Sequence, residues 1–332
     1  MLISNKQKKI LTLLSDGEFH SGTELAQTLS VSRSAICKQL SGLAILGLSH
    51  SAVSGKGYRL DKSLELLDPS AINAVLTEQN KAHISVFELH DSLNSTNSYL
   101  VEHSSNKAPS GFICFAEHQT AGKGRRGRQW LSPYGSNIYM SILWRFQQGG
   151  IASTAGLSLA IGVAVIRALK QLNISDVGLK WPNDIYSQGK KLGGILIEVS
   201  GETDGPCAAV IGLGLNLFLP ENQAQGIAQA WTDISKISGE IKVSRNKLAG
   251  LILNDVLTIV SDFETCGIKA YLDEWRSYDC LKGKEATLFM GQQQIQGIVE
   301  GIDDNGLLLI KKADGSVKAY ASGEVSFNPS IA

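Results

Sequence analysis

Residues 122–130 (GKGRRGRQW) bring three glycines and four cations together within one short segment. Glycine lets a backbone approach a ligand closely and adopt conformations that other residues avoid. Cations and free backbone N–H groups around such a turn form a concavity that suits oxyanions. Between Glu117 and Asp176 the chain has no acidic residue, so the segment stays positive. The pattern therefore predicts a phosphate-binding loop, with a solvated basic loop as the alternative.

The length and composition favour a cytoplasmic protein of several domains. A chain of 332 residues predicts about two to three domains. Its five cysteines are scattered and form no C-x-x-C pair, which argues against a disulfide framework and a zinc site and predicts no metal site. The apolar segment 156–166 is too short to cross a bilayer and predicts a buried helix, so no membrane partner is expected.

The first sixty residues have the pattern of a winged helix-turn-helix. Helical spacing of apolar residues predicts three short helices, and a turn at Ser54 and Gly55 predicts a two-stranded wing. Cations outnumber acids seven to three in this segment. The alternative is a protein-interaction module, but the cationic surplus favours DNA. The predicted DNA-binding residues lie on the third helix and the wing: Ser32, Arg33, Ser34, Lys38, Lys56 and Arg59.

The middle of the chain is mixed α/β. Strands are expected at 84–89, 112–117 and 137–146, and a hairpin follows the KWPND run at 180–184. Ser95, Thr96 and Asn97 are suited to cap a helix. Gly212 and Gly214 resemble the start of a dinucleotide fingerprint, but the third glycine is missing and a strand surrounds them. No Walker A pattern is present, so a nucleotide would bind without either fold.

Four motifs in order resemble the biotin protein ligase family: residues 122–130, KWPND at 180–184, KLGGIL at 191–196 and GLGLN at 212–216. With the N-terminal winged helix, the chain resembles the bifunctional members that also repress the biotin operon. The resemblance runs from about residue 5 to residue 327. It implies a central domain related to class II aminoacyl-tRNA synthetases. It also implies that biotin and MgATP form biotinyl-5′-AMP, from which biotin passes to a lysine of a carrier-protein domain.

The resemblance also implies roles for individual residues. Catalysis would depend on Lys191, Arg125 and Asp184, with Asp184 accepting the proton of the incoming amine. The biotin-binding residues would be Ser95, Thr96, Asn97, Gln119, Lys123, Gly124, Arg125 and Lys191. The ATP- and adenylate-binding residues would be Gly122, Arg125, Arg126, Asn183, Asn216 and Trp231. Lys123 departs from the family's arginine and loses its bidentate fork, which puts direct phosphate clamping at this position in doubt.

From Lys282 onward, five short strands separated by turns predict an SH3-like β-barrel, whose function the sequence leaves open. The predicted units are a DNA-binding domain at 1–63, a catalytic domain at 64–278 and a C-terminal domain at 279–332, an α/β multi-domain chain overall. The family further implies operator DNA as a partner and a homodimer when the adenylate is bound. Two rival functions remain: a ligase or transferase for lipoate or octanoate, and a ligand-sensing transcription factor without turnover.

Overall fold

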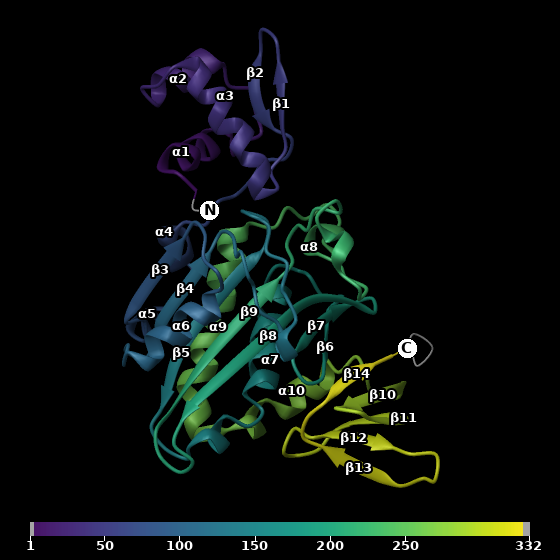
Figure 1. The fold of residues 1–332 in the computed structure, drawn as a ribbon. Coiled ribbons are helices and arrows are strands. Elements are labelled where there is room, and N and C mark those ends of the chain that lie inside the picture. The colour runs from purple at the N-terminus through teal and green to yellow at the C-terminus, as the bar shows by residue number, and fades with distance from the viewer. Residues whose placement is uncertain (1–2, 328–332) are drawn as a thin grey trace.

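The computed structural model of the chain describes residues 3–327, so the outermost ends of the first and third predicted units (1–2 and 328–332) lie outside the described residues. Figure 1 shows the N-terminal unit at one end of a central α/β body and the C-terminal sheet beside its far end. The described strands form a two-stranded, a seven-stranded and a five-stranded sheet. The domain limits at 63/64 and 278/279 stay a prediction.

The N-terminal unit has the helices and wing expected from the sequence. Its elements are α1 (Asn5–Leu14), α2 (Gly22–Thr28), α3 (Arg33–Ser41), a 3-10 helix (Gly42–Leu46), β1 (His50–Val53) and β2 (Gly57–Leu60). Ser4, Ser21 and Ser32 cap the three α-helices by accepting a backbone N–H three residues on. Apolar faces of the helices meet in one buried cluster, in which Leu14 and Ile36 are fully buried.

The central sheet carries the site. Its order is β3-β4-β5-β9-β8-β7-β6, with β3 and β4 parallel and the other neighbours antiparallel. The strands are β3 (Val86–His90), β4 (Phe112–Ala116), β5 (Ile138–Phe146), β6 (Gly178–Lys180), β7 (Asp184–Ser187), β8 (Lys190–Gly201) and β9 (Cys207–Leu215).

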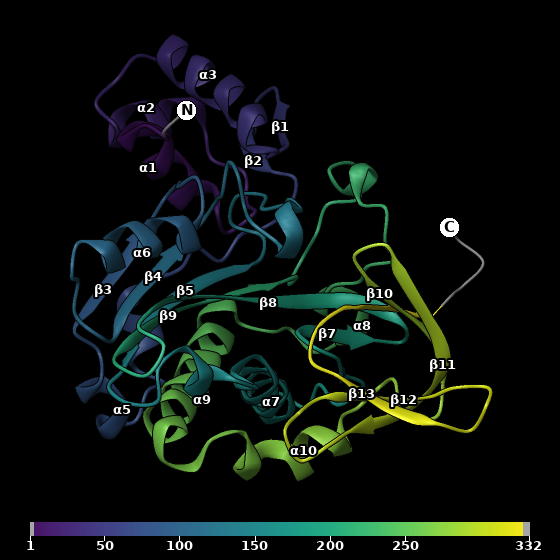
Figure 2. The same ribbon diagram turned by 60° about the horizontal axis from the view of Figure 1, so that its bottom comes forward.

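Helices cover both faces of this sheet, as Figure 2 shows. On one face lie α7 (Leu157–Gln171), α9 (Arg245–Cys266) and α10 (Leu272–Ser277), and on the other α6 (Thr96–Ser105). Residues 151–171, which include α7, are long and apolar enough to cross a membrane, but α7 is packed into the core, as the sequence predicted for 156–166. Short helices complete the body: α4 (Pro69–Asn73), α5 (Glu78–Ala82) and α8 (Ile234–Ile237).

The C-terminal unit is a five-stranded antiparallel sheet, matching the number of strands expected. Its order is β13-β12-β11-β10-β14. The strands are β10 (Glu285–Met290), β11 (Gln293–Ile302), β12 (Leu308–Lys311), β13 (Val317–Tyr320) and β14 (Glu324–Ser326). Its apolar side joins the core of the central body through residues such as Leu288 and Val325.

Residues 61–70, which connect the first two units, are held in place by long-range hydrogen bonds. The Glu65 carboxylate accepts the backbone N–H groups of Arg245 (2.7 Å) and Asn246 (3.2 Å), at the start of α9. Leu67 is buried, and its N–H donates to the Glu117 carboxylate at 2.6 Å. These bonds anchor the segment to the central body, and the Glu65 carboxylate is favourably placed because it lies at a helix N-terminus.

Candidate active site

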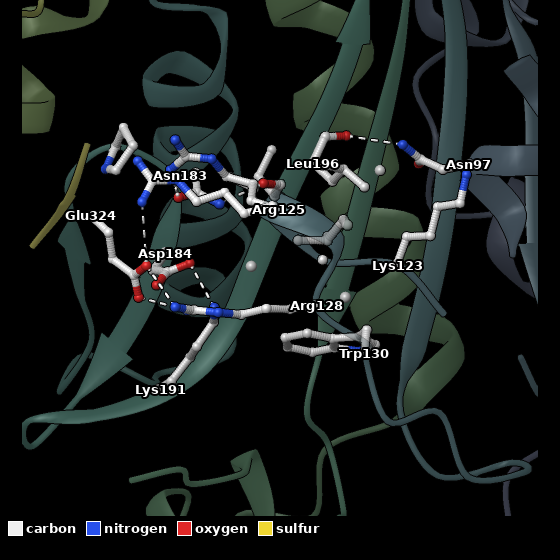
Figure 3. A pocket seen from close by; sticks show the side chains of 18 of the residues that line it. Asn97, Lys123, Arg125, Arg128, Trp130, Asn183, Asp184, Lys191, Leu196 and Glu324 are labelled. Atoms are coloured by element: carbon white, nitrogen blue, oxygen red, sulfur yellow. Dashed lines mark hydrogen bonds and ion pairs between the residues drawn. The ribbon is translucent and has the colours of Figure 1, made fainter. Parts of the chain in front are cut away.

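One pocket lies over the middle of the central sheet, between the glycine-rich loop and the C-terminal sheet (Figure 3). Strands β7, β8 and β9 form its floor, and α6 contributes its N-terminus. The pocket collects eleven of the residues singled out from the sequence: Ser95, Thr96, Asn97, Gln119, Lys123, Gly124, Arg125, Arg126, Asn183, Asp184 and Lys191.

The glycine-rich loop folds back on itself. The Gly124 N–H donates to Arg128 O and the Trp130 N–H to Gly122 O, both at 2.7 Å. Arg126, at the tip, has a positive φ of 57°. A Cβ on Gly122 would lie 2.5 Å from Trp130 O, so only glycine allows this close return of the chain. Gly122 therefore shapes the loop, and within the described structure it does not line the pocket.

One end of the pocket is a network of neutral polar side chains. Gln119 Oε1 accepts the N–H of Thr96 at 2.9 Å, and Ser141 Oγ donates to Asn97 Oδ1 at 2.7 Å. Asn97 Nδ2 in turn donates to Glu198 Oε2 at 2.9 Å. Ser95 caps α6 by accepting Ser98 N–H. A Cβ on Gly212 would lie 1.9 Å from Asn97 Oδ1, so this glycine makes room for the network.

The centre of the pocket is charged. Lys191 Nζ lies 2.8 Å from Asp184 Oδ1, and Arg125 Nη1 donates to Asn183 Oδ1 at 2.7 Å. Asn183 is itself held by a hydrogen bond from its Nδ2 to Ile195 O. Burial lowers the pKa of the Arg125 guanidinium, but arginine stays charged in proteins. Among residues 3–327, Arg125 bonds to a neutral amide and forms no ion pair, although the Asp184 and Glu324 carboxylates lie near enough to act on its charge. Its guanidinium is therefore available to an anion.

The remaining cations of the loop point in different directions. Arg128 forms a two-pronged ion pair with Glu324 on β14, with both N–O distances 2.6 Å. Arg126 Nη1 lies 3.8 Å from the same carboxylate, so both residues join the loop to the C-terminal sheet. Lys123 is exposed, and none of the described residues forms a hydrogen bond or ion pair with its side chain. The structure thus places Arg125 deepest in the site.

Two of the predicted ATP- and adenylate-binding residues, Asn216 and Trp231, lie next to the pocket rather than in its lining. Asn216 is buried and donates from Nδ2 to Thr232 O at 3.1 Å. This bond holds the backbone next to Trp231 in place. Trp231 pairs with Lys191 in an isolated parallel β-bridge, and its ring lies 4.1 Å from Lys236 Nζ. Asn216 acts on Trp231 through the backbone, which the GLGLN pattern alone could not indicate.

Several lining residues were missed by the sequence reasoning. Lys180 lies in the KWPND run, and Trp130 ends the glycine-rich run, so both carried a signal that was not used. Glu324 carried none, because it meets Arg128 across 196 positions of sequence. A Cβ on Gly214 would lie 2.5 Å from the Trp130 ring, which shows that the strand glycine admits this tryptophan.

The candidate DNA-binding residues gather on one exposed part of the N-terminal unit. Arg33, Ser34 and Lys38 are exposed on α3, and Ser32 caps its start. On the wing, Arg59 and Lys56 lie 4.7 and 5.8 Å from the Phe19 ring. A bond between Cys37 Sγ and Tyr58 Oη (3.0 Å) joins α3 to the wing. This contact fixes the position of the wing relative to α3, and therefore the position of the wing cations relative to those of the helix.

Comparison with known proteins agrees with this arrangement. Residues 89–216 match the biotin/lipoate A/B protein ligase family, residues 283–328 the biotin protein ligase C-terminal domain, and residues 6–59 a helix-turn-helix domain. The chain is 38% identical to the bifunctional ligase/repressor BirA of Escherichia coli, over 96% of each chain. It is 32% identical to that of Bacillus subtilis, over 96% of this chain and 98% of the relative.

A solved structure gives the same result in three dimensions. The biotin protein ligase from Aquifex aeolicus in complex with biotin and ATP superposes with a TM-score of 0.61 at 28% identity. It covers 73% of this chain and 98% of that one, which leaves part of this chain without a counterpart there. The full-length relatives also cover the winged helix, and the chain belongs to the family of bifunctional biotin ligase/repressors.

Proposed function

We propose that this chain activates biotin with ATP to biotinyl-5′-AMP and transfers the biotin to a lysine of a carrier-protein domain. The observation that carries this proposal is the pocket itself, where a neutral polar end adjoins Lys191 and the free charge of Arg125. Bringing a carboxylate against a polyphosphate requires that like charges be neutralised. Preorganised cations are the usual means of doing so.

The polar end suits the ureido ring of biotin. Donors and acceptors from Ser95, Thr96, Asn97 and Gln119 converge there. The carboxylate end of the substrate would then reach Lys191, with Lys123 and Gly124 closing over it from the loop. Asp184, now paired with Lys191, would accept the proton of the acceptor amine in the second step.

The nucleotide would extend from Lys191 toward Trp231. Stacking on that ring suits an adenine, and Arg125, Arg126 and Asn183 would contact phosphate oxygens. Mg²⁺ would arrive with ATP, because Mg²⁺ is usually held by substrate phosphates, water and one or two carboxylates. The described residues contain no cluster of three or more metal-binding side chains, and the pocket carboxylates Asp184 and Glu324 are both ion-paired. Phosphate oxygens would therefore be its main ligands.

The winged helix would make the enzyme a repressor of biotin-synthesis genes in the cytoplasm. The adenylate would order the glycine-rich loop and favour a homodimer that reads two operator half-sites, since an ordering loop can bias an interface. Equal operator affinity with and without biotin and ATP would contradict this switch.

The decisive experiment is incubation with biotin, MgATP and a carrier domain, followed by mass spectrometry of the carrier. We expect a biotin-sized mass increase on one lysine. The matched family also includes lipoate ligases, so lipoate is the control substrate. A thermal shift with lipoate rather than biotin would favour the rival ligase, because a ligand that binds the native state raises its melting point. Binding without diphosphate release would favour a sensor without turnover.

A further inference from the structure

Lys180 lines the pocket but has no role in the reaction described above. It ends β6, and in the sheet register it stands opposite Asp184, the first residue of β7. Its ammonium donates to Tyr186 Oη at 3.1 Å and lies 4.8 Å from the Tyr186 ring and 5.3 Å from the Phe327 ring. Burial lowers the pKa of this lysine, and the nearby Asp184 opposes that effect. The Lys180 ammonium is thus partly shielded from water and lies against the aromatic rings of Tyr186 and Phe327, which form this side of the pocket.

No carboxylate of residues 3–327 lies within ion-pairing distance of Lys180. Its neighbours differ, because Lys191 is paired with Asp184 at 2.8 Å and Arg128 with Glu324 at 2.6 Å. Holding a buried charge without a counter-charge costs free energy. A structural lysine would gain by facing water, whereas a lysine that awaits an anion must face the pocket.

We propose that Lys180 binds the diphosphate that leaves ATP when biotin is activated. This inference rests on the proposed function and adds one contact to it. The ligand class is a diphosphate or the distal part of a nucleoside triphosphate, recognised by an ammonium and the hydroxyl that holds it in place.

The order of strands supports this assignment. The polar end of the pocket lies over β9 and the start of α6, Lys191 lies on β8, Asp184 on β7 and Lys180 on β6. These strands follow one another across the sheet. Biotin, the reacting centre and Lys180 are therefore arranged in sequence, with Lys180 on the side opposite the biotin end.

Phosphoryl-type transfer needs such an order, because the attacking and leaving oxygens lie roughly in line. A biotin carboxylate oxygen forms a bond to the α-phosphorus of ATP. The bond from that phosphorus to the oxygen bridging to the β-phosphate breaks, and its electron pair leaves with diphosphate. The second step, attack of an amine on biotinyl-AMP, releases AMP and involves no diphosphate. A residue that serves the diphosphate must therefore affect the first step alone.

The test measures the two steps separately in the full chain. The variants are Lys180→Met and Lys180→Arg, with Lys284→Met as the matched control. Lys284 is exposed and lies 5.2 Å from the same Phe327 ring, but it does not line the pocket. Step one is followed as diphosphate release from biotin and MgATP, and in reverse as ATP formation from biotinyl-AMP and diphosphate. Step two is followed as transfer from supplied biotinyl-AMP to a carrier domain.

We expect Lys180→Met to lower kcat/KM for ATP and for diphosphate by about 10- to 100-fold, as loss of a charge-assisted contact does. Its transfer from supplied adenylate should remain within about twofold of the wild type. Lys180→Arg should recover part of step one, since it keeps the charge. Lys284→Met should behave as the wild type in both steps.

Equal loss in both steps, or an equal defect in Lys284→Met, would overturn the proposal in favour of a structural role in holding Phe327. An unchanged kcat/KM for ATP in Lys180→Met would also overturn it. Failure of the proposed function is distinguishable, because the wild type itself would then form no adenylate.

Discussion

At the scale of single residues, the shape of the site depends on glycines that let neighbouring groups pack closely, as much as on its charged side chains. Gly212 lies in β9 beneath Asn97, and an added methyl group would overlap the amide oxygen that Ser141 holds. Asn97 is tied to two elements, so it cannot move aside freely. The strand glycine therefore fixes the depth of the polar end.

Gly212→Ala should weaken biotin binding with little effect on ATP. Overpacking of this kind costs about 1–3 kcal/mol, which corresponds to roughly a 5- to 150-fold rise in the KM for biotin. Steady-state kinetics with each substrate varied in turn would check this. Gly226→Ala is the control, because a Cβ there meets nothing within 4 Å. An equal rise in both KM values would show that the substitution disturbs the whole pocket.

Arg125 gives a second prediction at this scale. Arg125→Gly should leave the fold intact but release biotinyl-AMP about 10- to 100-fold faster, because one charged contact is worth about 1.5–3 kcal/mol. The measurement is the decay of enzyme-bound labelled adenylate in a chase. Lys190→Gly removes an exposed cation outside the pocket lining and should not change the lifetime. An undiminished lifetime in Arg125→Gly would count against its phosphate contact.

At the scale of elements, local signals predicted the fold well and long-range contacts could not be predicted. The serine caps of α1, α2 and α3 act within three residues, so the sequence shows them directly. The polar end of the site could also be anticipated, because Ser95, Thr96 and Asn97 stand together at a helix start. The contact of Glu65 with α9 spans about 180 residues, and nothing in a polar, charged segment indicates its partner.

Glu65 makes this contact testable by pH. Burial acts to raise its pKa, but hydrogen bonds from Ser244, Arg245 and Asn246 outweigh burial and hold it below its usual value. A carboxyl whose pKa is lower in the folded state stabilises the fold above the unfolded pKa. That stabilisation is lost as pH falls through the folded value.

Glu65→Gln should therefore lower the free energy of unfolding at neutral pH by about 1 kcal/mol, a small figure because the side chain is partly exposed. The difference from the wild type should shrink below about pH 4.5 and vanish once the folded protein is protonated. Urea unfolding across this range measures it. Glu78→Gln, which removes an exposed surface carboxylate, is the control. A difference that grows toward acid would contradict the stated direction.

At the scale of the whole molecule, the catalytic body enters the core of the DNA-binding unit. Tyr134 follows the glycine-rich loop by a few residues, and it is fully buried in the cluster that α1, α2 and α3 form. Lys8 pairs with Asp91 at 2.8 Å, and Gln223 Nε2 donates to Gly47 O at 2.8 Å. These contacts join the two units through segments that also shape the pocket. A ligand that orders the loop has a short path to the DNA-binding unit.

The Tyr134 ring and its hydroxyl should have opposite effects on stability. The hydroxyl is buried without a hydrogen-bond partner among the described residues, and burial raises its pKa. Tyr134→Phe removes this unpaired group and should raise the free energy of unfolding by about 1 kcal/mol.

Tyr134→Ala removes the ring and should lower the free energy of unfolding by about 3–5 kcal/mol. It should also split thermal unfolding into two transitions, because the winged helix loses a buried apolar contact with the catalytic body. Calorimetry of both variants beside the wild type measures each effect. A single transition at an unchanged temperature in Tyr134→Ala would mean that the two units are held together by their polar contacts instead.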